Sequence, residues 1–125
     1  MSSFTMLEEA PLFETQNARM RSYATPSLNG SGLAVWRTEM DAGTAGPLHR
    51  ADREQILVVV AGRVRVTFGD DTRDLGPGDA AIIPANVQRT IANPFTEQAI
   101  LIAAGEPNAF AQTQTASRVP IPWTA

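Results

Sequence analysis

Few side chains of this 125-residue sequence can do acid–base or nucleophilic chemistry near neutral pH. Cysteine and lysine are absent, which excludes disulfides, thiolate nucleophiles and lysine Schiff bases. His49 is the only histidine, and an imidazole normally exchanges its proton between about pH 5 and 8. All ten basic residues are arginines, which are permanent cations. We therefore looked for proton transfer at His49 beside a fixed positive charge.

Two segments, residues 43–62 and 78–93, place turn residues at fixed offsets around His49. Their spacing resembles the paired motifs of the cupin superfamily, in particular small single-domain RmlC-like cupins. The positions in register are Gly43, His49, Gly62, Gly78, Pro84 and Asn93. The resemblance covers residues 32–104. It implies an all-β fold, the cupin double-stranded β-helix or jelly-roll barrel.

The metal-binding half of the family pattern is not conserved in this chain. The resemblance places Ala51 where the family has its second histidine, Gln55 where it has a glutamate, and Arg89 where it has its third histidine. Glu54 lies one position away from the glutamate position. An open catalytic metal site normally needs about three protein ligands, and an arginine brings a positive charge instead. We therefore expect no metal and no other cofactor.

The resemblance implies that His49 points into the barrel and that Gln55 and Arg89 converge on it from neighbouring strands. A nearby arginine disfavours the imidazolium, so the ring should be neutral and able to accept a proton. Our first hypothesis is an enzyme in which His49 abstracts a proton next to a carbonyl. Arg89 would stabilise the enolate and Gln55 would orient the substrate. The reaction would be a cyclisation, isomerisation, epimerisation or lyase-type elimination, by analogy with cupin sugar epimerases and polyketide cyclases.

Two other functions stay open. The barrel is alternatively a non-catalytic module, a sensor or carrier, that holds a small acidic or carbonyl ligand through Arg89. The third hypothesis is a metal-dependent oxygenase or lyase that uses His49 with Glu54 or Gln55 and a further ligand. Amide and guanidinium groups are poor replacements for the ligands that such metals prefer.

Each candidate also has a purely structural interpretation. His49 could be an ordinary core residue, and Arg89 could pair with an inward-facing carboxylate. Asp52 is a minor candidate for orienting His49. Trp36 and Tyr23 are candidates for lining the pocket and binding substrate, whereas aromatic residues on strands more often belong to a core or an interface.

Short runs of β-branched and apolar residues, separated by Gly, Pro, Asp and Asn, predict the strands that carry these side chains. The predicted strands are Leu33 to Met40, Gln55 to Val60, Arg63 to Phe68, Ala80 to Pro84, Gln88 to Asn93 and Gln98 to Ala103. Alternation in Arg63 to Phe68, followed by a turn at Gly69, Asp70 and Asp71, predicts a hairpin.

We divide the chain into an N-terminal arm (1–30), the cupin barrel core (31–104) and a C-terminal tail (105–125). The arm should contain at most one strand, near Arg19 to Tyr23. Prolines near the C-terminus exclude a central strand, so the tail should lie extended on the barrel with Trp123 as an apolar anchor.

Composition limits the partners. The net charge is −3, and the charges are interspersed, so a nucleic acid partner is not expected. The longest apolar run, Ile56 to Ala61, is too short to span a membrane. We expect a cytoplasmic protein that binds a small molecule. The arm and the apolar outer strand faces need covering, which predicts a homodimer.

Overall fold

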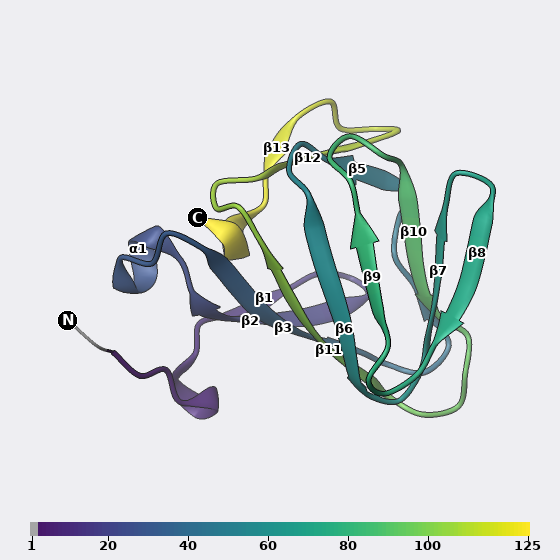
Figure 1. The fold of residues 1–125 in the computed structure, drawn as a ribbon, viewed down its shortest axis with the longest axis horizontal. Coiled ribbons are helices and arrows are strands. Elements are labelled where there is room, and N and C mark those ends of the chain that lie inside the picture. Colours follow the sequence, from purple (N-terminus) through teal and green to yellow (C-terminus); the bar gives the residue numbers. More distant parts are fainter. Residues whose placement is uncertain (1–2) are drawn as a thin grey trace.

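The computed structural model describes residues 3–125 and consists almost entirely of antiparallel strands in two sheets (Figure 1). The all-β fold predicted from the sequence is therefore confirmed. The two sheets pack face to face and close into a barrel, and helical structure is limited to three short segments: η1 (Leu7–Glu9), α1 (Pro26–Asn29) and η2 (Pro122–Thr124).

The first sheet has six strands in the order β1-β2-β3-β11-β6-β9. Their bounds are β1 Leu12–Glu14, β2 Ala18–Ala24, β3 Ala34–Met40, β11 Ala99–Gly105, β6 Gln55–Ala61 and β9 Ala80–Ile83. The second sheet follows the order β13-β12-β5-β10-β7-β8, and β4 pairs with β10 beside this path. Its bounds are β13 Val119–Pro120, β12 Phe110–Thr113, β5 His49–Ala51, β10 Arg89–Asn93, β7 Val64–Phe68, β8 Asp71–Leu75 and β4 Thr44–Ala45.

Side-chain alternation decides which face of each strand is buried. From Gln55 to Val60 of β6 the odd-numbered residues are buried and the even-numbered ones are exposed, as expected when successive side chains point to opposite faces. The predicted hairpin is present as β7 and β8, which pair from Val64 opposite Leu75 to Phe68 opposite Asp71. Gly69 takes a left-handed backbone conformation in its turn (φ 60°).

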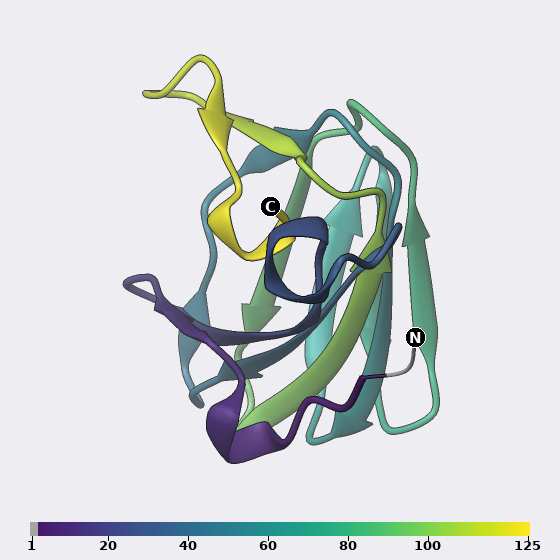
Figure 2. The ribbon, with the colours of Figure 1, turned by 90° about the vertical axis from the view of Figure 1, so that its left-hand side faces the viewer.

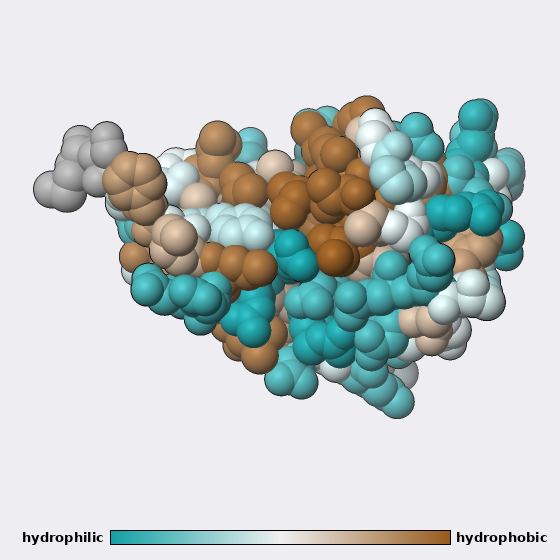
Figure 3. Space-filling model, turned by 90° about the horizontal axis from the view of Figure 1, so that it is seen from below, coloured by the Kyte–Doolittle hydropathy of each residue, from teal (hydrophilic) through white to brown (hydrophobic). Residues whose placement is uncertain are grey.

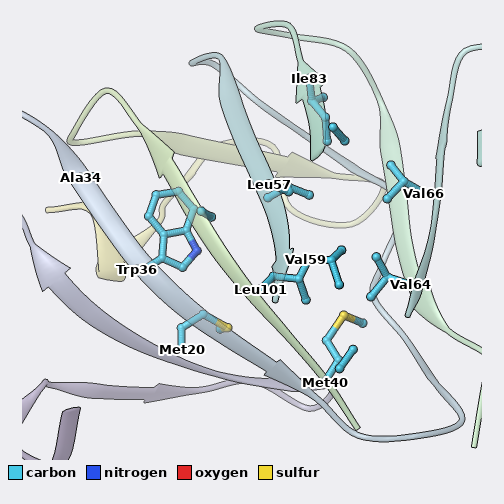
Figure 4. Close-up of a cluster of buried hydrophobic side chains, with 13 residues drawn as sticks. Met20, Ala34, Trp36, Met40, Leu57, Val59, Val64, Val66, Ile83 and Leu101 are labelled. Atoms are coloured by element: carbon cyan, nitrogen blue, oxygen red, sulfur yellow. The ribbon is translucent and has the colours of Figure 1, made fainter. Parts of the chain in front are cut away.

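The core lies between the sheets and is built from inward-facing apolar side chains of both (Figure 4). Leu57, Val59 and Leu101 come from the six-stranded sheet, whereas Val64 and Val66 come from the facing β7. Each of these side chains is less than one-tenth exposed. Burial on this scale stabilises the fold by roughly 1.5–3 kcal/mol per large aliphatic side chain.

Both ends of the chain take part in the barrel. Residues 12–24 form two strands of the six-stranded sheet, one more than the sequence predicted, and Met20 of β2 is buried in the core. At the other end, Trp123 packs against Phe13 with the ring centroids 6.4 Å apart. The Ser27 hydroxyl donates to the Ala125 carbonyl oxygen (2.6 Å), which fixes the C-terminus beside α1 (Figure 2).

The outer face of the barrel carries several exposed apolar side chains. Ile56, Val58 and Val60 of β6 and Ile82 of β9 are 37–55% exposed. Figure 3 shows how apolar and hydrophilic residues separate into distinct areas on one side of the molecule. Among residues 3–125, none of the helices has the length and apolar character needed to cross a membrane.

Candidate functional site

A cavity of about 450 Å³ lies between the two sheets. It falls within the range of roughly 300–1,000 Å³ that is typical of small-molecule sites. Strands β2, β3, β6 and β11 contribute to one side, and β5, β10, β12 and β13 contribute to the other. Most of the wall is apolar, and residues 119–123 of the C-terminal tail close part of it. We call this space the barrel cavity.

His49 lines the barrel cavity from β5 and is oriented by the segment just before that strand. Its Nδ1 lies 2.9 Å from the carbonyl oxygen of Pro47. A carbonyl oxygen can only accept a hydrogen bond, so Nδ1 carries the proton in this arrangement. In the neutral ring, Nε2 on the other side then has a free lone pair. The ring is therefore set up as a proton acceptor.

The surroundings of His49 favour this neutral form. Burial lowers the pKa of His49 below its ordinary value of 6.5, and the nearby positive charge of Arg89 lowers it further. The hydrogen bond to Pro47 acts in the opposite direction but does not outweigh burial. The sequence predicted a neutral ring because of Arg89, but burial is the larger cause.

Gln55 and Trp36 line the same cavity from the six-stranded sheet. Gln55 begins β6 and is 9% exposed, and Trp36 lies on β3 and is 4% exposed. Gly105 lies opposite Gln55 on β11, where a Cβ would come within 2.8 Å of the Glu54 carbonyl oxygen. Only glycine permits this close strand approach, which positions the start of β6, where Gln55 lies. Figure 4 shows the Trp36 indole turned toward the barrel interior.

Arg89 is a buried cation without a partner. Its residue is 1% exposed, and none of its three guanidinium nitrogens makes a hydrogen bond to residues 3–125. Burial lowers the pKa of Arg89 to about 10, so the side chain is still charged at neutral pH. The sequence left open a pairing with an inward-facing carboxylate, but none of the ion pairs formed by residues 3–125 includes Arg89.

Arg89 and His49 face each other directly across the β10–β5 pair. Directly opposed residues of antiparallel strands point to the same face of the sheet, with Cβ atoms about 5 Å apart. Ile91, two residues further along β10, lines the barrel cavity, so Arg89 lies on the cavity face of its strand. However, Arg89 is not itself part of the cavity wall. It lies beneath that wall, beside His49.

Two other sequence candidates lie elsewhere. Tyr23 is on β2 but does not line the barrel cavity, and its carbonyl oxygen accepts hydrogen bonds from Thr5 and Asn29. Asp52 does not orient His49. Its Oδ1 accepts a hydrogen bond from the Phe110 backbone N–H (2.8 Å), which ties β12 to the segment after β5.

Sequence reasoning missed two groups. The carbonyl of Pro47 orients His49, but a backbone acceptor leaves no signal in residue types. Thr38 lines the barrel cavity two residues after Trp36 on β3. The period of two along this strand could have indicated Thr38 once Trp36 was placed on the cavity face.

The residues at this site do not fit a divalent metal ion. Among residues 3–125 there is no group of three or more His, Asp, Glu or Cys side chains close enough to hold one. The imidazole of His49 is the only good ligand of the set, beside an amide and a buried guanidinium. A cation in this place would also be repelled by the charge of Arg89.

A barrel of two antiparallel sheets with a mainly apolar cavity between them is the architecture of this protein. A family model described as "Cupin domain" matches residues 36–105, and the chain belongs to this family. The predicted resemblance to cupins is thus confirmed.

Solved structures show the same fold. An RmlC-like cupin from Shewanella frigidimarina is 21% identical, with a TM-score of 0.72 over 86% of this chain and 92% of that one. KdgF from a Halomonas species is 22% identical, with a TM-score of 0.74 over 86% and 94%. Oxalate decarboxylase from Bacillus subtilis is 18% identical, with a TM-score of 0.74 over 85% of this chain and 30% of that one. At these identities the likeness establishes the fold alone. No curated protein matches the sequence.

Proposed function

We propose that this cupin binds a small organic molecule in the barrel cavity and transforms it by metal-independent acid–base chemistry at His49. One observation carries the proposal: the hydrogen bond from Nδ1 to the Pro47 carbonyl, which leaves Nε2 of a neutral ring as proton acceptor at the cavity wall. A base held in place in this way can contribute roughly 10²–10⁴-fold to a reaction rate.

The chemistry that fits this base is proton abstraction from a carbon next to a carbonyl. Nε2 takes the proton, and the electron pair of the C–H bond moves through the C–C bond onto the carbonyl oxygen to form an enolate. The proton then returns to another carbon or to the other face of the same carbon, so isomerisation or epimerisation balances without a co-reactant. In an elimination, the C–H electron pair instead becomes a new C=C bond, a leaving group on the next carbon departs with the electron pair of its own bond to carbon, and His49 passes the proton to that group or to water. The charge of Arg89 close to His49 favours the negative enolate.

The other cavity residues position the substrate. The Gln55 amide can donate to a carbonyl oxygen, and Trp36 provides an apolar surface. Of the described cavity-lining residues, His49 is the only titratable one. The same imidazole must therefore both remove and return the proton.

Exchange of carbon-bound hydrogen for deuterium tests this proposal directly. The protein is incubated in D2O with a panel of small aryl ketones and keto acids, including 4-oxo-4-phenylbutanoate, and exchange is followed by proton NMR. We expect exchange above the buffer rate with the native chain and loss of it in His49→Gln. Arg50→Gln is the matched control, because Arg50 is the next residue on β5 and its Nε donates to Gln112 outside the cavity. Equal rates in the native chain and His49→Gln would contradict the proposal.

A second candidate is a non-catalytic small-ligand carrier or sensor. The observation in its favour is the largely apolar cavity wall, which offers no acid besides His49 among the described residues. Binding of panel compounds without exchange of any of them would support this function and overturn the catalytic one.

A further inference from the structure

The most unusual group in the molecule is the guanidinium of Arg89. It is the largest fully buried side chain, and its Nε, Nη1 and Nη2 atoms lack hydrogen-bond partners within residues 3–125. An uncompensated buried charge is strongly unfavourable, so buried arginines are normally paired with a carboxylate. Every aspartate and glutamate of the described chain is at least partly exposed, and none reaches Arg89.

Arg89 lies next to the barrel cavity, which is where a partner for its guanidinium could bind. Arg89 shares the cavity face of β10 with Ile91 and lies directly opposite His49, and both of these neighbours line the cavity. The backbone register thus places Arg89 next to two residues of the cavity wall. Arginine has a long unbranched stem, so rotation about its side-chain bonds can bring the planar group to the cavity edge.

We propose that the ligand of this cavity is a mainly apolar molecule with one carboxylate, and that Arg89 binds this carboxylate beside His49. The inference rests on the proposed small-molecule function and adds the substrate class to it. The apolar wall fits the body of such a molecule, and a guanidinium binds a carboxylate through two parallel hydrogen bonds.

The carboxylate is preferred to other anions for two reasons. An enolate exists only during a reaction, whereas a carboxylate would satisfy Arg89 throughout the life of the complex. A phosphate dianion would need more than one positive charge, and no other arginine of the described chain lines the barrel cavity. One buried cation matches one monoanion.

Calorimetry with a matched pair of probes tests the assignment. The probes are 4-oxo-4-phenylbutanoate and its primary amide, which have nearly the same shape and differ in charge. We expect the native chain to bind the acid at least roughly tenfold more tightly than the amide, as is typical of hydrogen bonds to charged groups. Arg89→Met should bind both equally, whereas Arg65→Met, at an exposed arginine paired with Asp74, should keep the preference.

A second readout uses the single histidine of the chain. A carboxylate bound to Arg89 would cancel part of its effect on His49, so the acid should raise the pKa of His49 measured by NMR in untagged protein, and the amide should not. Far-ultraviolet circular dichroism checks that Arg89→Met folds.

Equal binding of acid and amide by the native chain, or a preference that survives in Arg89→Met, would overturn the assignment. So would tighter binding of 3-phenylpropylphosphonate than of the carboxylate probe. These results are separate from the exchange assay. Selective binding of the acid without exchange would support the carboxylate site and overturn the catalytic function. Equal exchange of acid and amide would support the catalytic function and overturn the carboxylate site.

Discussion

Replacing Arg89 with methionine should make the ligand-free protein more stable. Burial lowers the pKa of Arg89 to about 10, and one pKa unit corresponds to about 1.4 kcal/mol, so holding this charge inside the fold costs on the order of 3 kcal/mol. Methionine removes the charge and keeps a long flexible side chain. Its smaller volume loosens the packing, which lowers the stability by about 1 kcal/mol. The expected net gain is about 2 kcal/mol, or a rise in melting temperature of roughly 5–10 °C.

Urea denaturation and thermal melting of the ligand-free proteins measure this effect. Arg89→Lys keeps a buried charge and should show no gain. Arg65→Met removes an exposed arginine whose ion pair with Asp74 contributes less than about 1 kcal/mol, so its stability should change little. The reasoning would be refuted if the free energy of unfolding of Arg89→Met fell by more than the roughly 1 kcal/mol that looser packing explains. Such a loss would mean that the guanidinium is satisfied inside the folded protein.

Three further measurements follow from the structure. The pKa of His49 is lowered below 6.5, so the unfolded chain binds more protons between the folded-state pKa and 6.5; stability should fall as pH falls through that window in the native chain but not in His49→Gln, and catalysis by the native chain should show an acid limb below pH 6.5. Asn93→Ala should lower the free energy of unfolding by about 2–3 kcal/mol in urea, because the fully buried amide donates to the Met40 and Glu97 carbonyl oxygens; an unchanged midpoint would contradict this. We also propose a homodimer in which the exposed apolar Phe4 of one copy covers the apolar outer face of β6 on another; light scattering should give a dimer for the native chain and a monomer for Val58→Glu, and a native monomer would contradict it.

The strands that could be predicted from the sequence are those with one buried face. Along Gln55–Ala61 and Val64–Phe68, buried and exposed side chains alternate, and the residue types alternate with them. The hairpin was predicted, but the residue range of its second strand, β8, was not, because Asp71–Leu75 forms an edge with almost no buried face and its residues need no apolar period. Strand β13 contains Pro120 and pairs only with β12, at the sheet edge where proline is tolerated.

The site was only partly predictable for a related reason. Motif spacing identified His49, Gln55 and Arg89, because turn glycines fix the offsets around them. Gly62 shows how strict these offsets are: its backbone is left-handed (φ 70°) and a Cβ would lie 2.8 Å from the Cα of Ala99. Whether Arg89 has a carboxylate partner depends on which way every acidic side chain points. That orientation is set by tertiary packing and has no local signal.

The buried arginine connects stability with function. At the neighbouring motif position the chain has Ala51, which is fully buried and packs with Ala109 and Ile121 at no electrostatic cost. An apolar residue at position 89 would make the empty barrel more stable in the same way, so Arg89 has no advantage in a protein without a ligand. A carboxylate that reaches the guanidinium would offset the cost of its burial, and binding would then stabilise the native chain through this one side chain. The melting temperature should therefore rise more with 4-oxo-4-phenylbutanoate than with its amide in the native chain, whereas the two probes should raise it equally in Arg89→Met, even though the unliganded variant is the more stable of the two.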